Sequence, residues 1–446
     1  MKRVLFISYY FPPSISAGSF RILRFVKYLP ENGWIPYVLT IKTKKYIRNS
    51  LDFDILKSFP KEAKIFRTHI FLFSEKYKNL LKFLKSITLN LKGKNEVCQK
   101  ENKIKVNPNS SKGSYKKIPG ELLRTPDIDI GWLPFAFFRG IFLIYKNKID
   151  VIYATGGPFT TPIIGLLLKK FTRLPLVVDF RDPWSDNYIR DFSNPYFKKL
   201  AYYFEKKVLK NADKIIANNE ALKNNLISLH KEISREKFFV ITNGFDEDDF
   251  NDLRQVSFEK YSIAYIGSLY DSHSPDSFLK GLKNLVEKVP GIEKNIQVLF
   301  VGDEGKKYIE KVKEYSIDKM VYFLGEKPHR DSLEILISSN LLLATLTVPP
   351  GATFIPGKIY EYMRSGKPIL AITTEGAFKN FLKIEVPNAK ILDPQDIDGI
   401  TDAIHFFYKK YLESAKSSYL SLESSIEKFN VKFLTEKLSK VLAEVN

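Results

Sequence analysis

The sequence predicts two doubly wound α/β domains in succession, each built on a parallel β-sheet. Three observations lead to this prediction. The chain has 446 residues, 44% of them hydrophobic, which is enough for two domains with separate cores. Short apolar segments alternate with longer amphipathic ones, as in βαβ units. A second such series begins after a polar stretch at Asn243–Asp252, so we expect the domains to be joined there.

The first series defines an N-terminal domain at residues 1–245. Its expected strands are short and apolar, with helical patterns such as Arg21–Leu29 and Thr161–Lys170 between them: Val4–Ser8, Tyr37–Ile41, Val151–Ala154, Leu176–Phe180, Lys214–Ala217 and Phe238–Thr242. The region from about 75 to 129 interrupts the alternation. It begins with a basic amphipathic pattern at Glu75–Lys92 and continues with little apolar content, which is typical of an insertion.

The second series defines a C-terminal domain at residues 246–430. Its expected strands are Ser262–Ile266, Gln297–Val301, Val321–Leu324, Leu341–Thr345, Pro368–Ile372 and Lys390–Leu392. Its expected helices are Asp276–Lys288, Lys306–Tyr315, Asp331–Ser338 and Ile359–Ser365. A last amphipathic segment within residues 431–446 carries one apolar stripe and therefore needs a surface to pack on.

Charge and cysteine content restrict the partners and the compartment. The formal net charge of +20 favours polyanions, whether nucleic acid, acidic lipid or phosphorylated substrates. The single cysteine, Cys98, fits a reducing cytoplasm. No segment has the roughly 18 uncharged apolar residues of a spanning helix. The nearest, Leu133–Tyr145, is interrupted by Arg139 and is either a core helix or a surface that lies on an anionic leaflet.

The first strand-to-helix loop is a candidate anion site. Gly18 precedes Arg21 and Arg24, so backbone N–H groups and two cations could face an anion, although an ordinary βα turn explains the loop equally well. The dinucleotide fingerprint G-x-G-x-x-G is absent, and no acidic residue ends the second strand at Thr40-Ile41-Lys42. A redox Rossmann enzyme is therefore a poor interpretation.

Polar residues also crowd the end of the strand at Leu176–Phe180. Arg181 and Asp182 follow it directly, at the edge where open α/β sheets bind ligands. A structural Asp–Arg pair would account for them, but their density and position favour a functional role.

The third candidate is the helix that begins near Pro356-Gly357-Lys358. The free N–H groups and positive dipole end of such a helix suit a diphosphate, and Lys358 adds a full charge. Glu361, one turn further on, can accept hydrogen bonds from ribose hydroxyls. A capped surface helix would explain the helix ends but not the lysine and glutamate together.

Taken in order, five motifs resemble the retaining GT-B glycosyltransferases of family 4: Asn243–Asp246, Gly267–Leu269, Val301–Gly305, Phe323–Gly325 and Gly357–Pro368. Asp179–Trp184 is similar to the Arg-Asp-x-Trp element of some members. The resemblance covers nearly the whole chain except the insertion at about 75–129, and it implies two Rossmann-like domains that face a cleft. It also implies that the last helix crosses back onto the first domain.

The resemblance implies a nucleotide-sugar donor in the C-terminal domain and an acceptor in the N-terminal one. The implied donor-binding residues are Gly267, Ser268, His273, Gly302, Phe323, Leu324, Gly357, Lys358, Ile359 and Glu361. Among them, Phe323 and Leu324 stand where the base usually stacks. We expect acceptor binding at Gly18, Arg21, Arg24 and Asp182, and catalytic roles for Arg181, Asp182, Lys358 and Glu361.

Several positions depart from the family pattern. Thr353 stands at the earlier place of a glutamate pair that ends in Glu361, and Ser268 and His273 stand where many members hold the diphosphate with arginine and lysine. Arg181 stands where many members have histidine. Either Lys358, Arg181 and the helix dipole supply the missing positive charge, or the donor or the activity differs.

We expect sugar transfer without a metal or a resident cofactor. Asp52-x-Asp54 and Asp127-x-Asp129 have the spacing of a metal-holding pair, but neither follows a strong strand. The resemblance further implies retention of anomeric configuration. We expect a lipid-linked or saccharide acceptor at the cytoplasmic face of the plasma membrane. There the basic segment Glu75–Lys92 and the apolar run Leu133–Tyr145 could contact the lipid surface.

Other functions stay open at this stage. A nucleic-acid-binding protein would fit the charge, but no known module is present and the lysines spread over the chain, so we expect no specific nucleic acid. The departures at Ser268 and Thr353 keep open a non-catalytic scaffold that binds a partner or a sugar. An epimerase on the same fold is a less favoured alternative.

Overall fold

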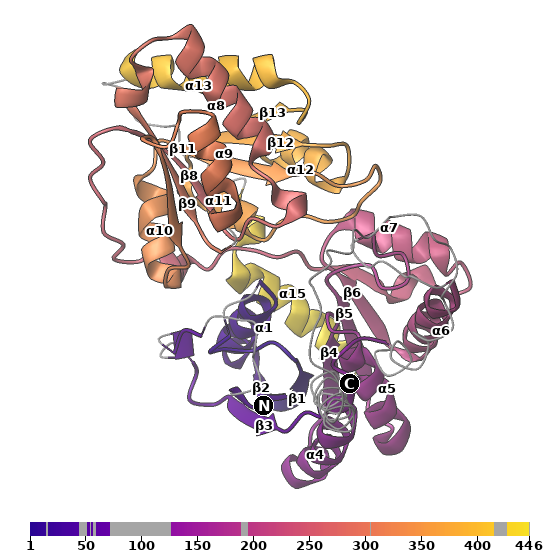
Figure 1. Cartoon of the computed structure of the whole chain (residues 1–446). Helices are drawn as coiled ribbons and strands as arrows, with labels where there is room; N and C mark the ends of the chain where they lie inside the picture. The colour runs from indigo at the N-terminus through magenta and orange to yellow at the C-terminus, as the bar shows by residue number, and fades with distance from the viewer. Residues whose placement is uncertain are drawn as a thin grey trace, which may run out of the picture.

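The computed structural model describes residues 1–14, 17–43, 51–53, 55–56, 59–71, 126–188, 195–303, 305–413 and 426–445. Two α/β domains follow one another along the chain, and a final helix returns to the first (Figure 1). The predicted pair of doubly wound parallel sheets is confirmed. The predicted basic segment at 75–92, together with Cys98 and Asp54, lies outside the described residues.

The N-terminal sheet has seven parallel strands in the order β3-β2-β1-β4-β5-β6-β7. Their bounds are β1 Lys2–Ile7, β2 Trp34–Ile41, β3 Lys64–Thr68, β4 Val151–Thr155, β5 Leu176–Phe180, β6 Lys214–Ala217 and β7 Phe238–Val240. The sequence analysis did not predict β3. This strand is an edge strand whose charged and apolar residues mix and are mostly half-buried, so it lacks the continuous apolar run of a central parallel strand.

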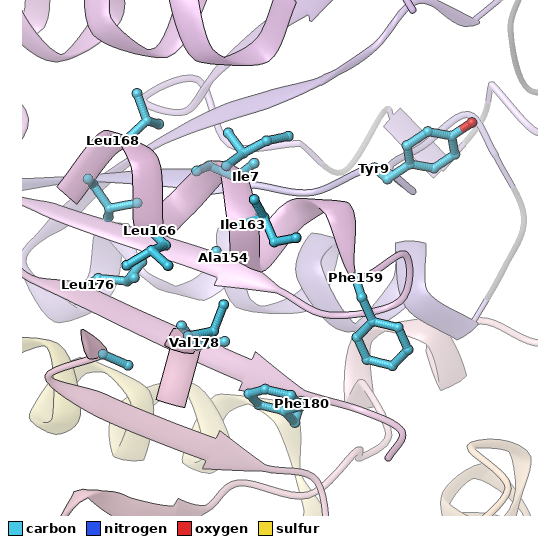
Figure 2. Close-up of a cluster of buried hydrophobic side chains, with 14 of the residues drawn as sticks. Ile7, Tyr9, Ala154, Phe159, Ile163, Leu166, Leu168, Leu176, Val178 and Phe180 are labelled. Atoms are coloured by element: carbon cyan, nitrogen blue, oxygen red, sulfur yellow. The ribbon is translucent and has the colours of Figure 1, made fainter. Parts of the chain in front are cut away.

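Helices cover both faces of this sheet. They are α1 Ala17–Tyr28, α4 Leu133–Asn147, α5 Thr160–Thr172, α6 Pro195–Asn211 and α7 Glu220–Leu229. The central strands β4 and β5 are buried along their whole length. Their side chains pack with those of α5 in one apolar cluster that includes Ile163, Leu166 and Val178 (Figure 2).

The C-terminal sheet repeats the arrangement with six parallel strands in the order β10-β9-β8-β11-β12-β13. Their bounds are β8 Tyr261–Ile266, β9 Ile296–Val301, β10 Val321–Gly325, β11 Leu341–Leu346, β12 Ile369–Thr373 and β13 Ala389–Leu392. The helices are α8 Asp276–Lys288, α9 Ile309–Glu314, α10 His329–Ser338, α11 Lys358–Ser365, α12 Ala377–Glu385 and α13 Ile397–Glu413. In both sheets the strand order reverses beside the first strand, which is where ligands bind in doubly wound folds.

The last helix, α15 Val431–Ala443, lies against α1 of the N-terminal domain (Figure 1). Asn430 caps its start by accepting a hydrogen bond from the Lys432 amide. Leu434, Leu438 and Leu442 are buried in the cluster formed by the inner side chains of α1 and the first sheet. The apolar stripe seen in the sequence is therefore covered by the domain at the other end of the chain.

The apolar run at Leu133–Tyr145 forms α4, which has a buried side, as expected of a core helix, and an exposed side. On its inner side Ala136, Leu143 and Ile144 are buried. On its outer side Phe138 is 71% exposed and Tyr145 is 68% exposed. Among the described residues, no helix has both the length and the apolar character that crossing a bilayer requires.

Replacing Leu438 with alanine should lower the free energy of unfolding by roughly 2–5 kcal/mol, because the change leaves a cavity between α15 and α1. Urea unfolding measures the loss. The exposed neighbour Lys437→Ala is the matched control and should stay within about 0.5 kcal/mol of the unchanged protein. Equal losses in the two variants would mean that α15 does not pack as described.

Candidate functional site

A cavity of about 960 Å³ lies between the two domains. It is lined by the first loop and helix of the N-terminal domain, the connection at Thr242–Gly244, and the carboxyl ends of β8 and β9 with the starts of α10 and α11. Six of the predicted donor-binding residues line it: Gly267, Ser268, Gly302, Gly357, Lys358 and Glu361. The structure thus brings together residues that lie almost a hundred positions apart.

Lys358 is the first residue of α11 and lines this cavity. Its Nζ lies 3.3 Å from the centre of the Tyr265 ring, and a Cβ added to Gly267 would be 3.6 Å from it. Burial lowers the pKa of Lys358 well below its usual value. Within the described part of the chain no carboxylate pairs with Lys358, so an incoming anion would favour its charged form.

Close backbone packing shapes the adjoining wall. Gly302 has φ +140°, and a Cβ there would collide with the carbonyl of Gly267. The Gly302 amide donates to Gly325 O at 2.8 Å, and the Gly267 amide to Val301 O at 2.7 Å. Glycine is required at Gly302 because the ends of β8 and β9 approach each other so closely, and neither Gly267 nor Gly302 places a side chain beside Lys358.

A network of four ionisable side chains joins the domains beside Lys358. Arg24, on α1, donates to Asp249 Oδ2 at 2.9 Å and to Glu361 Oε1 at 2.8 Å, and its other nitrogen donates to Gly244 O. His329 Nε2 lies 3.3 Å from Asp249 Oδ2 and 3.9 Å from Glu361 Oε1. Glu361, which we predicted to hold a ribose, is thus paired with the opposite domain.

The charges of this network reinforce one another. Burial opposes ionisation of Asp249, but hydrogen bonds from His329 and Arg24 outweigh it and hold the pKa of Asp249 well below its usual range. Burial also opposes protonation of His329, yet the hydrogen bond to Asp249 and the charge of Glu361 raise the pKa of His329 above its usual value. Arg24 therefore faces two carboxylates, and His329 adds a second positive charge when it is protonated.

Asp249, His329 and Glu361 also have the composition of a metal site, with their ligand atoms within 4.8 Å of one another. Arg24 already places a positive charge on both carboxylates. The arrangement fits an ion-pair network better than a metal centre. Asp127, from one of the acidic pairs with metal-binding spacing, accepts hydrogen bonds from the amide and hydroxyl of Thr160 at the start of α5.

Two of the predicted acceptor residues, Gly18 and Asp182, lie with the predicted catalytic Arg181 in a second group at the carboxyl ends of β4 and β5, whereas Arg24 belongs to the ion-pair network. The guanidinium of Arg181 donates to the carbonyl oxygens of Gly156, at 2.7 Å, and Gly157. It also passes so close to Gly18 that a Cβ there would collide with it. Burial raises the pKa of Asp182, against the opposing charge of Arg181. A carboxyl with a raised pKa beside an arginine is suited to proton exchange.

Arg21 does not belong to this group. Its guanidinium makes five hydrogen bonds, two to the Asp179 carboxylate and the others to Ile241 O, Thr242 O and Asn243 Oδ1. An arginine has five N–H donors, so none is left for an acceptor. Arg21 instead ties α1 to β5 and to the connection between the domains, which corrects the prediction made from its place in the loop.

Phe323 and Leu324 are a second correction, because neither lines the cavity. Phe323 stacks on Phe300 with ring centres 5.2 Å apart and packs over Gly305. Leu324 points to the opposite side of the sheet, into a separate groove of about 460 Å³. Both lie within β10, so their side chains point to opposite faces of the sheet and not off its carboxyl edge.

Two further predicted donor residues contribute no free side-chain group to the cavity. Burial and the nearby charge of Lys358 lower the pKa of His273 to about 3, so this ring is neutral and does not replace the expected cation. Ile359 is fully buried, and its amide donates to Pro356 O at 3.2 Å. Ser268 lines the cavity, with its carbonyl accepting a hydrogen bond from the Tyr265 hydroxyl.

The sequence analysis missed Asp249 and His329. Asp249 lies in an acidic run after the first domain, and His329 follows a proline at the start of α10. Neither position has a motif, and they lie 80 residues apart. The only available signal was Arg24, a cation on the inner side of an amphipathic helix, which requires a buried partner.

The proton on His329 should stabilise the folded protein. Since its pKa is raised by folding, this contribution is present below about pH 6.5 and is lost as the pH rises through the higher folded value. His329→Gln should therefore reduce the free energy of unfolding more at about pH 6 than at about pH 8.5. His405→Gln is the control, because folding lowers the pKa of His405 and the dependence should reverse. A pH-independent loss in His329→Gln would contradict this assignment.

Removing the charge of Arg24 should be more damaging than removing an exposed arginine. Arg24→Met leaves two partly buried carboxylates with only His329 as a partner, and should lower the free energy of unfolding by up to roughly 3–5 kcal/mol. Arg330→Met, which removes a half-exposed arginine from its pair with Glu334, should cost less than about 1 kcal/mol. Adding Asp249→Asn and Glu361→Gln to Arg24→Met should recover part of the loss, and a further loss would count against the network.

Comparisons with known proteins agree with this architecture. A family described as Glycosyltransferase Family 4 matches residues 108–249, and one described as Glycosyl transferases group 1 matches residues 260–410. A D-inositol 3-phosphate glycosyltransferase of Corynebacterium kroppenstedtii is 23% identical over 190 residues, which are 39% of this chain and 41% of that protein. The alignment thus spans less than half the length of that relative.

Solved structures show the same fold over almost the whole chain. Sucrose-phosphate synthase of Thermosynechococcus elongatus has a TM-score of 0.65 at 15% identity, with 100% of this chain and 99% of that one covered. A glycosyltransferase involved in lipopolysaccharide biosynthesis has a TM-score of 0.57 at 11% identity, with 99% and 95% covered. At such identities the likeness establishes the fold alone. The fold is GT-B, and the two domains are similar to the families described as Glycosyltransferase Family 4 and Glycosyl transferases group 1, in that order along the chain.

Proposed function

We propose that this protein is a retaining, metal-independent glycosyltransferase of the hexosyltransferase type. In this proposal a nucleotide-diphosphate sugar binds in the interdomain cavity as the donor, and no resident cofactor takes part. The acceptor is a saccharide or a lipid-linked saccharide in the synthesis of a cell-surface polysaccharide or glycolipid. The protein would act at the cytoplasmic face of the plasma membrane.

The observation that carries the proposal is the unpaired ammonium of Lys358 at the start of α11. The charge of a half-buried lysine without a carboxylate partner is disfavoured until an anion binds beside it. The diphosphate of a donor would supply that anion beside the bare wall at Gly267 and Gly302. In the transition state the same ammonium would stabilise the charge that develops on the leaving diphosphate.

Glu361 would hold the ribose one turn along the same helix. Its carboxylate is only 13% exposed, and Oε1 is bonded to Arg24, so ribose hydroxyls would donate to the second oxygen, Oε2. Arg24 would keep its bonds to Asp249 and Gly244 and remain in place. The donor would therefore bind with both domains already in contact.

On the acceptor side, Arg181 and Asp182 stand at the carboxyl end of β5. Asp182 would orient the acceptor hydroxyl, with Arg181 limiting the rise of its pKa. In the retaining reaction the bond between the sugar carbon and the diphosphate oxygen breaks, and a bond to the acceptor oxygen forms on the same face. The acceptor proton passes to the leaving phosphate oxygen.

A non-catalytic scaffold is the second candidate, and the pairing of Glu361 with Arg24 favours it. If that pair is permanent, a ribose could use only the second carboxylate oxygen of Glu361 and would be held less firmly. The same GT-B fold would then present its cavity to a partner or a sugar without turnover. Nucleotide-sugar binding and transfer separate the two candidates.

Thermal shifts with a panel of nucleotide diphosphates and their sugars provide the test. A ligand at a hundredfold excess over its Kd should stabilise the protein by about 2.7 kcal/mol. Lys358→Met should abolish the shift, and Glu361→Gln should weaken it. Lys383→Gln, which changes an exposed lysine on α12, is the control and should leave it intact.

The outcomes divide cleanly. Binding followed by transfer of labelled sugar, lost in Lys358→Met, supports the transferase. Binding with neither sugar transfer nor donor hydrolysis supports the scaffold. No shift with any member of the panel would exclude the donor site at α11.

A further inference from the structure

Five aromatic side chains lie exposed on one outer face of the N-terminal domain, and we call them the aromatic face. Four belong to α4 and one to the end of α5: Phe135, Phe138, Phe142, Tyr145 and Phe171. The four on α4 follow one another every third or fourth residue, so they share one side of the helix. The opposite side of α4 is buried against the sheet, which leaves the aromatic face without a covering element in the described structure.

The rings of this face lie close to one another. Phe138 is 71% exposed and Phe171 is 68% exposed, and Phe137 joins them, with its ring centre 5.4 Å from Phe138 and 5.0 Å from Phe171. The face is thus continuous from α4 to α5. Isolated exposed apolar residues are normal on protein surfaces, but a contiguous patch of large rings marks an interaction site.

The charges around the face all have one sign. Neither α4 nor α5 contains an aspartate or a glutamate. Arg139 lies over the ring of Phe142 at 5.0 Å, and Lys146 lies over the same ring at 5.3 Å. Lys170 is exposed beside Phe171. Basic side chains thus surround apolar rings, with no acidic residue on either helix.

We propose that the aromatic face is a docking surface for an anionic lipid bilayer. The rings would lie at the boundary between head groups and acyl chains, while Arg139, Lys146 and Lys170 would meet lipid phosphates. A second copy of this chain fits less well, because a two-fold contact would bring like charges together without an acidic partner. The proposal deepens the proposed function, since it assigns the membrane surface on which a lipid-linked acceptor would lie.

The position of α4 supports this assignment. Just before the helix, Trp132 Nε1 donates to Thr68 Oγ1 at the carboxyl end of β3, at 2.7 Å. Phe135 lies near His69, with ring centres 6.2 Å apart, and Lys42 bonds His69 at 2.6 Å. One end of the aromatic face therefore adjoins the edge of the sheet where substrates bind. A lipid-linked acceptor could approach that edge without leaving the bilayer.

Vesicle sedimentation tests the surface. The full chain should bind vesicles of phosphatidylcholine mixed with phosphatidylglycerol, bind phosphatidylcholine alone weakly, and dissociate as salt is raised. Phe138→Ser with Phe142→Ser should weaken binding at least about tenfold, because two rings no longer enter the interface. Lys146→Gln with Lys170→Gln should weaken it roughly thirtyfold, since each basic residue near the surface contributes about 1 kcal/mol.

The matched control lies on the other domain. Phe406→Ser with Lys409→Gln changes an exposed ring and an exposed lysine on α13 and should leave vesicle binding unchanged. All variants should keep the melting temperature of the unchanged protein, which separates loss of docking from loss of folding. The lysine variants change only exposed side chains and so remain informative if the phenylalanine variants unfold.

Three results would overturn the proposal. The first is equal vesicle binding by the aromatic-face variants and the unchanged protein. The second is binding that does not depend on anionic lipid. The third is a dimer in solution that Phe138→Ser with Phe142→Ser converts to a monomer, which would make the face a contact between copies. Thermal shifts with nucleotide-sugars, measured on the same samples, report on the proposed transferase separately.

Discussion

The Arg24 guanidinium, bonded to carboxylates of both the interdomain connection and α11, is the contact on which the cavity depends. It is buried, and it joins the first helix of the chain to Asp249 and Glu361. Arg21, one turn earlier, binds Asp179 and the connection with all of its donors. Together these two arginines hold α1 against the connection between the domains. The position of α1 at the side of the cavity therefore depends on ion pairs that are largely shielded from solvent.

The same contact explains why Lys358 and Glu361 behave differently although they lie on one helix. Glu361 faces α1 and finds a cation there, whereas Lys358 faces the ends of β8 and β9, where Gly267 and Gly302 carry no side chain. The cavity therefore contains a carboxylate paired with an arginine and a lysine that no carboxylate pairs with in the described part of the chain, while Asp303 and Glu326 also line it. The proposed function assigns the diphosphate of a nucleotide sugar to that lysine.

The helix α4 has two sides of different character. The sequence left open whether Leu133–Tyr145 was a core helix or a membrane-facing surface. In the structure small and aliphatic residues such as Ala136 and Leu143 pack on the sheet, and Phe138 and Tyr145 face outward. A helix in a βαβ crossover needs only one apolar side, so the aromatic residues on its other side require a different physical reason.

Much of the fold could be predicted from the sequence because it depends on local patterns. Buried parallel strands need continuous apolar runs, and helices between them need one apolar stripe, so twelve strands were visible before any contact was known. The edge strand β3 was missed because it is only half-buried. In the site, Gly357, Lys358 and Glu361 were found because a helix start with its neighbouring charges is contained in one segment.

The sequence by itself thus determined two doubly wound domains, a cationic helix start at α11 and an apolar last helix that needed a partner. Only the tertiary structure decided which side chains could bind a ligand and which already bond to other parts of the protein. Arg21 and Arg24 look alike along α1, yet their partners lie more than 150 residues away. Hydrogen-bond satisfaction depends on which distant atoms folding brings within about 3 Å, and no local pattern contains that information.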